Sequence, residues 1–378
     1  MTKRSMTVGA IVLCVVIAAA VAAVGMSKRS KSPDTAGGKP EVTLTVNRAN
    51  VAVGQAVRLT GVLSGVGATK DTTVALQRKK GARWVTMARE ESRRDGSYAF
   101  VRIFDEPARG VFRTVALRQG TSLDASSPQR VAVKASRPSG TPLPVDLGAK
   151  KLTDCAASEQ PCFSIDDQEG RRVLRFPMVT VNVGPGPLEI HGYRSSRSSN
   201  DWIAALTTHY TGGGTRSRSL PHMVFYYAED GHNHWHIRDF DYYQVLDSSG
   251  KVVRRGEKHG FCFEDNTTFR DWSQHPAEHP GVPQRPVYAH ESSCGEERPY
   301  TTSIVHGLSM GWADTYPTSL PNQNIDITGL ADGIYTVRVE VDGQHLVPET
   351  DETNNNATVR VQIQGRRVLV DASTATGF

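Results

Sequence analysis

Short runs in which apolar and polar residues alternate occupy the first part of the chain, and turn residues separate them. Between residues 41 and 136 the runs follow one another at roughly ten-residue spacing: EVTLTV, AVRLTGVL, TTVALQRK, RWVTMARE, GSYAFVRIF, GVFRTVALR and QRVAVKA. A period of two residues predicts half-buried strands, and short strands at this spacing are typical of an immunoglobulin-like sandwich. We therefore predict such a sandwich over residues 41–136.

A second set of strand-like runs follows a linker rich in Pro, Gly and Ser, ASRPSGTPLP. The set comprises VLRFPMVTVNVG, PLEIHGY, HMVFYYA, HNHWHIRDFDYYQVLD, KHGFCFE, NIDIT, IYTVRVEVD and ATVRVQI. Between Asn266 and Tyr300 the periodicity disappears, and an irregular stretch of that length is often functional or held by a disulfide. The second domain is therefore expected to be a β-sandwich with long irregular loops.

These patterns divide the chain into six segments. The predicted boundaries are an N-terminal targeting segment at 1–26, a linker at 27–40, the first sandwich at 41–136, a linker at 137–148, the second domain at 149–366 and a tail at 367–378. The whole chain is predicted to be all-β. Its 34 Gly and 20 Pro agree with this, because they supply many turns and interrupt helical patterns.

The N-terminus predicts export. Lys3 and Arg4 precede an apolar run from Val8 to Val24, and a basic cluster follows it. The run is either a cleaved signal peptide or a membrane anchor, so the protein is expected to be secreted or membrane-anchored on the extracytoplasmic side, and to touch a membrane only through this segment. Cys14 lies inside the run without the small residues that precede a lipidated cysteine, and we interpret it as a buried thiol.

The remaining cysteines are even in number: Cys155, Cys162, Cys262 and Cys294. In an exported chain they are expected to form disulfides, and we favour the short-loop pairing of Cys155 with Cys162 and of Cys262 with Cys294 over the two other connectivities. Four reduced, buried cysteines are the alternative. The absence of a CxxC spacing disfavours a cysteine zinc site.

The distribution of charged residues does not indicate a particular binding partner. The formal net charge is +5, and the Lys and Arg residues are scattered along the chain. A nucleic-acid-binding protein usually carries a dense basic stripe, so we expect no nucleic-acid partner.

Three histidines recur at every second position in GHNHWHIRDF. On a strand His232, His234 and His236 would project from one face, which is the arrangement that shared metal ligation requires. The outer two Cβ atoms of a flat strand stand roughly 13 Å apart, so the strand must be twisted, bulged or bent, and Gly231 could permit this. The spacing suits Zn²⁺ or Cu²⁺, and solvated histidines on a polar strand are the alternative.

The order of motifs around and after the histidines resembles the lysyl oxidase family. HNHWHIRDFDYYQVLD is similar to the family's copper-binding strand, EKHGFCFED to its lysine-bearing strand, and GLSMGWADTY with NIDIT to its cofactor-tyrosine segment. IYTVRVEVDGQHLVPETDETNN and VLRFPMVTVNVGPGPLEI are similar to the final and first strands. The resemblance covers residues 150–363 and leaves the N-terminal sandwich outside.

The resemblance implies the cofactors. His232, His234 and His236 would be copper ligands, and Lys258 and Tyr316 would together form lysine tyrosylquinone with the help of copper and O₂. Amine oxidation needs an electron sink that no ordinary side chain provides, and the quinone would be that sink. The implied activity is oxidative deamination of primary amines, either peptidyl lysine or free amines, to aldehydes with release of hydrogen peroxide and ammonia.

Asp314 is our candidate for the general base, because a strand residue two positions from Tyr316 shares its face. A carboxylate that caps a turn is the alternative. The chain departs from animal members of the family at Tyr242, where they commonly carry a histidine, and at His259, which follows the lysine rather than preceding it. These departures put the range of substrates in doubt.

Two other groups have simpler interpretations. The carboxylates of PETDETNN could bind Ca²⁺, but a turn is the interpretation we favour. His275, His279 and His290, in the irregular stretch, are expected to be surface histidines.

The leading hypothesis is therefore an extracytoplasmic copper-dependent amine oxidase that uses O₂ and amine- or lysine-containing substrates. A non-enzymatic metal-binding adhesin or matrix module made of two β-domains is the alternative. A hydrolytic zinc enzyme is a weaker third option, because the chain has no HExxH signature.

Overall fold

The computed structural model describes residues 39–65, 72–228, 233–256, 260–290 and 292–378. The predicted targeting segment, His232 and Lys258 lie outside the described residues. The described part consists of strands with three short 3₁₀ helices, η1 (Ala157–Glu159), η2 (Trp272–Gln274) and η3 (Ala372–Thr374), which confirms the prediction of an all-β protein. Within these ranges no helix has the length and apolarity that crossing a membrane requires.

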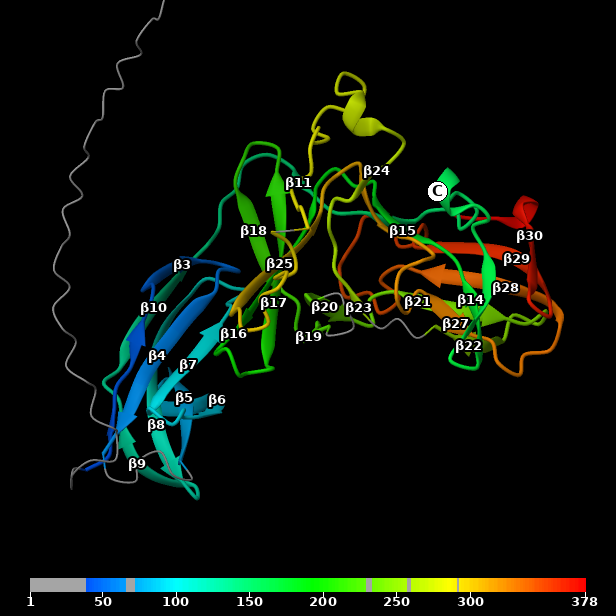
Figure 1. Ribbon diagram of the computed structural model, residues 1–378. Coiled ribbons are helices and arrows are strands. Elements are labelled where there is room, and N and C mark those ends of the chain that lie inside the picture. The colour runs from blue at the N-terminus through cyan, green and yellow to red at the C-terminus, as the bar shows by residue number, and fades with distance from the viewer. Residues whose placement is uncertain (1–38, 66–71, 229–232, 257–259, 291) are drawn as a thin grey trace, which may run out of the picture.

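Two sheets make up the N-terminal part of the molecule (Figure 1). The smaller sheet contains β1 (Glu41–Val42), β4 (Val57–Ser64), β2 (Thr45–Val46) and β7 (Ser97–Arg102). The larger sheet contains β3 (Asn50–Ala52), β10 (Gln129–Lys134), β8 (Ala108–Arg118), β5 (Thr72–Lys80), β6 (Arg83–Glu91) and β9 (Thr121–Ala125).

The two N-terminal sheets share one hydrophobic core. Leu59 of β4 and Phe100 of β7 contribute to it from the smaller sheet, and Leu76 of β5 and Phe112 of β8 contribute from the larger one. Alternate residues of a strand point to the same face, so the period-two pattern in the sequence is what places these side chains inside. Two packed sheets are what a sandwich requires, and the immunoglobulin-like type stays a prediction.

Five sheets make up the rest of the described residues. The first contains β11 (Pro142–Leu143), β17 (Trp202–Tyr210), β16 (Leu188–Arg194), β25 (Ser303–Leu308) and β18 (Thr215–Ser219), and the second contains β12 (Leu147–Ala149), β15 (Met178–Asn182), β26 (Trp312–Tyr316) and β24 (Thr267–Thr268). The third contains β13 (Ser164–Gln168), β14 (Arg171–Arg175) and β27 (Asn324–Asp326), and the fourth contains β19 (Phe225–Tyr227), β20 (Trp235–Arg238) and β23 (Gly260–Phe261). The fifth contains β22 (Val252–Arg255), β21 (Tyr242–Leu246), β28 (Gly333–Glu340), β29 (Asn356–Gln364) and β30 (Arg367–Asp371).

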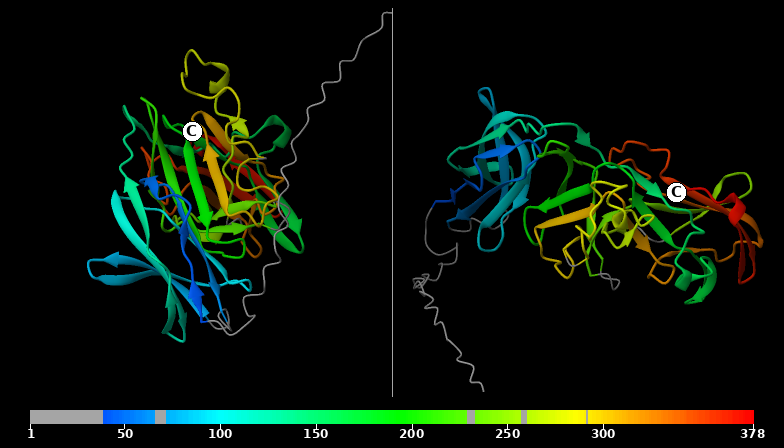
Figure 2. Two further views of the ribbon diagram at one scale, coloured as in Figure 1. Left: turned by 90° about the vertical axis from the view of Figure 1, so that its left-hand side faces the viewer. Right: turned by 90° about the horizontal axis from the view of Figure 1, so that it is seen from above.

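One extended core joins these five sheets. Phe261 of β23 and Tyr316 of β26, from different sheets, belong to it, as does Phe176, which directly follows β14. Strands β11 and β12 begin within the predicted linker 137–148, and β30 pairs with β29 inside the predicted tail 367–378, so both segments are more ordered than their composition suggests. Figure 2 shows β1–β10 at one end of an elongated molecule and the C-terminal strands at the other.

Hydrogen bonds between the two parts hold them together. The Arg58 guanidinium donates to the carbonyl oxygens of Ser195 (2.8 Å) and Arg194 (3.1 Å), and the Ser195 hydroxyl donates to Glu90 (3.0 Å). Charge-assisted bonds of this kind are stronger than neutral ones. The contact fixes the N-terminal part against the end of β16, where the Arg194 guanidinium stacks on Trp235 of β20 at 4.6 Å.

The PETDETNN segment, in the connection between β28 and β29, forms a turn, as predicted. Asp351 accepts hydrogen bonds from the backbone N–H (2.8 Å) and the hydroxyl (2.6 Å) of Thr353, which is an Asx-type turn. The preceding carboxylate, Glu349, is buried and accepts a bond from Asn355 Nδ2 (2.9 Å) and one from the Leu147 N–H.

Burial gives this region a pH-dependent stability. Desolvation raises the pKa of Glu349 to about 8 and that of Asp342 to about 7. Both groups have pKa values near 4 when unfolded, so above about pH 4 the folded chain retains protons that the unfolded chain has lost, and stability falls as pH rises toward about 8. We expect the urea midpoint of the metal-free protein to be lower near pH 9 than near pH 7, and to fall less in Glu349→Gln. A midpoint that rises over this interval would contradict the assignment.

Candidate metal and tyrosine site

His236 lies in β20, the central strand of the fourth sheet, and His234 directly precedes this strand. Asn233, just before them, has a left-handed φ of 52°, so the backbone is bent where the three-histidine spacing requires a distortion. His236 stands opposite Tyr226 of β19 in the ladder. The alternation places Trp235 on the other face, where its ring packs edge-on against Trp202 at 4.8 Å between centroids.

The two histidines face each other through their Nε2 atoms, which are 2.8 Å apart. His234 Nδ1 lies 2.8 Å from the Glu296 carboxylate, and His236 Nδ1 lies 3.2 Å from the Tyr226 hydroxyl. A carboxylate only accepts, so His234 carries its proton on Nδ1 and directs the Nε2 lone pair at His236. Two ring nitrogens this close need a proton or a metal ion between them.

The surroundings of the pair fit a metal centre. His234 is 7% exposed and His236 is 2% exposed. Burial lowers the pKa of His234, with Glu296 opposing the shift, so the ring is neutral and able to bind a metal at neutral pH. A ligand histidine whose other nitrogen donates to a carboxylate is the usual arrangement around zinc and copper in proteins.

A third histidine and a second carboxylate extend the site toward solvent. His290 Nδ1 lies 2.9 Å from Glu264, and its Nε2 lies 3.6 Å from Glu296. Ligand atoms of His234, His290 and Glu296 lie within 4.8 Å of one another, but the His234 atom that faces Glu296 is the protonated Nδ1, so Glu296 acts here as a hydrogen-bond acceptor. His290 is half exposed, as a surface histidine would be, but its contacts place it at the mouth of the site.

Tyr316 is the last residue of β26, and its ring is buried against Phe261. Its hydroxyl donates to the Cys262 carbonyl oxygen (2.9 Å) and accepts from the Cys262 N–H (3.1 Å). Burial, and next the charge of Asp314, raises the pKa of Tyr316 well above its ordinary value, so the phenol stays protonated. The backbone next to β23 thus fixes the position of this hydroxyl.

Asp314 lies inside β26, two residues before Tyr316. The interpretation as a loop carboxylate that caps a turn is therefore wrong in its location, because the residue is in a strand and only 1% exposed. Its Oδ1 accepts a hydrogen bond from Asn266 Nδ2 (2.8 Å), and Asn266 Oδ1 accepts from the Thr315 N–H (2.8 Å). Asn266 therefore holds the carboxylate in one orientation.

One pocket of about 260 Å³ joins these groups. It is lined by His234, Cys262, Glu264, Asn266, His290, Glu296, Asp314, Thr315, Tyr316 and Leu320. The structure thus brings His234 together with Asp314 and Tyr316. His234 and Tyr316 are 82 positions apart in the sequence. His232 and Lys258 lie outside the described residues, so the pocket is described without them.

The sequence patterns did not predict several residues that line the pocket. Glu264 lies in the FCFED stretch and Glu296 lies two residues after Cys294, but single carboxylates in such places carry no periodic signal. The one sequence feature that pointed to Glu296 was its closeness in sequence to Cys294, which was predicted to form a disulfide. His275 and His279 do not line the pocket; His275 is exposed, as predicted, and His279 is partly buried and stacks on Trp272 at 4.4 Å between ring centroids.

Both disulfides join the cysteines that short-loop pairing predicts, Cys155 with Cys162 and Cys262 with Cys294. The alternative of four reduced cysteines is wrong. The second bond lies at the pocket, because Cys262 both lines it and holds Tyr316.

Comparison with known proteins agrees with this geometry. The lysyl oxidase family model matches residues 289–373, and protein-lysine 6-oxidase of Sus scrofa is 30% identical over 227 residues, which are 60% of this chain and 70% of the pig protein. The chain belongs to the lysyl oxidase family. Protein-lysine 6-oxidase of Rattus norvegicus is 30% identical and that of Gallus gallus 26% identical over the same length. The match spans only 43% and 42% of these two relatives of the lysyl oxidase family, so much of their length has no counterpart here.

Proposed function

We propose that this chain is a copper-dependent amine oxidase of the lysyl oxidase type that deaminates primary amines. The observation that carries the proposal is the shared pocket of His234, Asp314 and Tyr316 in a member of the lysyl oxidase family. The overall reaction converts one amine, one O₂ and one water into one aldehyde, one ammonia and one hydrogen peroxide.

His232, His234 and His236 would hold the metal. The convergent Nε2 atoms of His234 and His236, with Glu296 on the far side of His234, support this assignment. Bound copper would supply the redox chemistry that, with O₂, oxidises the tyrosine ring. Copper rather than zinc is part of the proposal because only the former changes its oxidation state.

Lys258 and Tyr316 would form lysine tyrosylquinone, the group that accepts the two electrons of the amine. Tyr316 suits this role because Cys262 fixes its hydroxyl and the pocket reaches its ring. A fixed ring position matters because the lysine nitrogen must meet one carbon of that ring. The role of Lys258 rests on its place in EKHGFCFED.

The remaining groups would act on the substrate. Asp314 would take the proton from the carbon that bears the amine, since its carboxylate lines the pocket beside Tyr316 and is held by Asn266. Glu264 and Glu296 would attract the ammonium form of the substrate to the mouth. Lysine side chains of proteins and free amines are both within the proposed substrate class.

Location and domain roles complete the proposal. The chain would act outside the cytoplasm, secreted or anchored through residues 1–26, and the two disulfides support an oxidising compartment. The boundaries 41–136 and 149–366 would separate an immunoglobulin-like spacer from the copper domain.

The test is to load the purified chain with copper in air. We expect a visible quinone absorbance, amine-dependent peroxide release, and a peptide in which Lys258 is crosslinked to Tyr316. Metal binding with an unmodified Tyr316 and no peroxide would instead support a metal-binding adhesin or matrix module.

A further inference from the structure

Residues 294–298 are fastened to the histidine strand along their whole length. The Cys294 carbonyl oxygen accepts from the Trp235 N–H (2.8 Å), and the Glu297 N–H donates to the Asn233 carbonyl oxygen (2.8 Å). The Trp235 indole donates to the Arg298 carbonyl oxygen (3.2 Å). We call residues 294–298 the clamp segment, because it contacts the backbone on both sides of His234.

The clamp segment delivers one side chain to the metal ligands. The Glu296 carboxylate lies 2.8 Å from His234 Nδ1. This contact is far from local, since 62 residues separate the partners. It settles which nitrogen of His234 is protonated, and therefore that Nε2 is the atom offered to a metal.

The clamp segment has little regular structure of its own. It follows an irregular stretch in which the two-residue strand β24, η2 and turns are the described elements, and Cys294 and Glu297 both have left-handed φ values, 51° and 50°. Side chains with Cβ atoms seldom adopt this conformation unless their surroundings impose it. Something other than local preference must therefore hold the segment in place.

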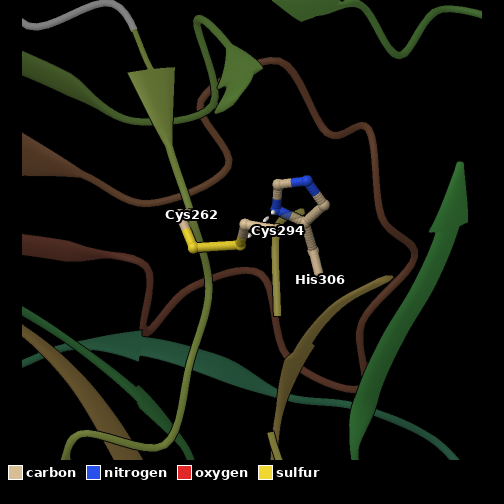
Figure 3. Close-up of side chains that lie close together, drawn as sticks. All are labelled: Cys262, Cys294 and His306. Carbon is tan, nitrogen blue, oxygen red and sulfur yellow. Dashed lines mark hydrogen bonds between the residues drawn. A yellow bond between two sulfur atoms is a disulfide. The ribbon is translucent and has the colours of Figure 1, made fainter. Parts of the chain in front are cut away.

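The Cys262–Cys294 disulfide adds a covalent restraint to the hydrogen bonds that hold the segment. Cys262 directly follows β23, which pairs with β20 through Phe261 and Ile237, so the bond ties the clamp segment to the sheet that carries the histidines. Figure 3 shows the disulfide with the His306 ring beside it, and His306 Nδ1 lies 3.3 Å from Cys294 Sγ. Both sulfurs are fully or almost fully buried.

His306 packs against the disulfide as a neutral ring and carries no charge. It is completely buried, and desolvation lowers its pKa to about 3, so the ring is neutral. Cys262, Cys294 and His306 lie close enough to share an ion, but both sulfurs are used in the disulfide, so the trio acts as a structural support.

We infer that Glu296 is a positioning residue for His234 and that the Cys262–Cys294 disulfide holds it there. The inference rests on the proposed metal site. It makes closure of this bond a condition for tight metal binding, whereas the Cys155–Cys162 bond, which encloses η1, has no such role.

The direct test compares Glu296→Gln with Glu297→Gln in the full chain. The two variants remove the same charge from neighbouring positions, but the exposed Glu297 reaches the strand only through its backbone. We expect Glu296→Gln to weaken copper affinity about 10- to 100-fold, with an altered Cu(II) electron paramagnetic resonance spectrum and an unchanged melting temperature. Glu297→Gln should match the wild type, and equal affinity of all three proteins would overturn the inference.

The disulfide is tested by Cys262→Ala with Cys294→Ala, and the matched control is Cys155→Ala with Cys162→Ala. The first pair should weaken affinity as much as Glu296→Gln does, and adding Glu296→Gln to it should cause no further loss, because both act through one contact. The control pair should keep the wild-type affinity even where its stability drops. The disulfide's role would be contradicted if the control pair lowered copper affinity as much as the first pair. It would also be contradicted if the losses of affinity from Glu296→Gln and from the first pair added in full.

A metal-free measurement separates this inference from the proposed function. In protein labelled with ¹⁵N-histidine, His234 should show the tautomer protonated on Nδ1, and Glu296→Gln should shift it toward the other tautomer. If copper fails to bind although this tautomer is present, the proposed function is wrong and the positioning role stands. If the tautomer does not depend on Glu296, the positioning role is wrong whatever the metal does.

Discussion

Tyr316→Phe is expected to abolish both the quinone absorbance and the amine-dependent peroxide release while leaving copper bound. The phenylalanine ring lacks the oxygen from which a quinone starts, and the histidines do not depend on it. The lost hydroxyl makes two hydrogen bonds to the Cys262 backbone, at 2.9 and 3.1 Å, so a modest loss of stability of about 1–3 kcal/mol is also expected. Absorbance after aerobic copper loading, peroxide release and copper content are the measurements.

Tyr243→Phe is the matched control. Tyr243 is also buried, its pKa is also raised by burial, and its ring packs edge-on against the same Phe261 as that of Tyr316. Its hydroxyl donates to Gln323 instead of reaching the pocket backbone. The control should keep its absorbance and its activity, and a chromophore that survives in Tyr316→Phe or disappears in Tyr243→Phe would refute the assignment of the cofactor tyrosine.

The sequence predicts the features that depend on local periodicity. Alternation in runs such as TTVALQRK and ATVRVQI corresponds to β5 and β29, because the side-chain period of a strand is two. The same period predicts that His234 and His236 share a face, and the structure brings their Nε2 atoms to 2.8 Å. Parity and loop length were enough to predict both disulfide pairs.

Other features depend on contacts that no local pattern encodes. Glu296 reaches His234 across 62 residues, from a clamp segment whose backbone has no strand period. Strand β30 falls inside the predicted tail 367–378, yet its pairing with β29 gives it a place in the fifth sheet. In both cases a residue or strand far away in the sequence fixes the position of the segment. The local sequence of the segment therefore does not predict its place in the fold.

Asp314→Asn is expected to reduce turnover by about 10²- to 10⁴-fold, the range that a positioned general base contributes. The amide can still accept the hydrogen bond from Asn266, which is 2.8 Å long with the carboxylate, so the strand and the pocket should keep their shape. The quinone absorbance should therefore form as in the wild type, and the KM for the amine should change little. Separate measurement of chromophore yield, kcat and KM distinguishes a lost proton acceptor from a damaged site.

Asp265→Asn provides the contrasting variant. Asp265 is equally buried, but it lies outside the pocket lining and accepts hydrogen bonds from the backbone N–H groups of Val287, Tyr288 and Ser309 and from the Ser309 hydroxyl. An amide in its place must turn an N–H toward other donors, so this variant should lose stability and not proton transfer. If Asp314→Asn behaved in the same way, with a lower melting temperature and an unchanged kcat in the folded fraction, Asp314 would be a structural carboxylate and the base would have to be sought among Glu264 and Glu296.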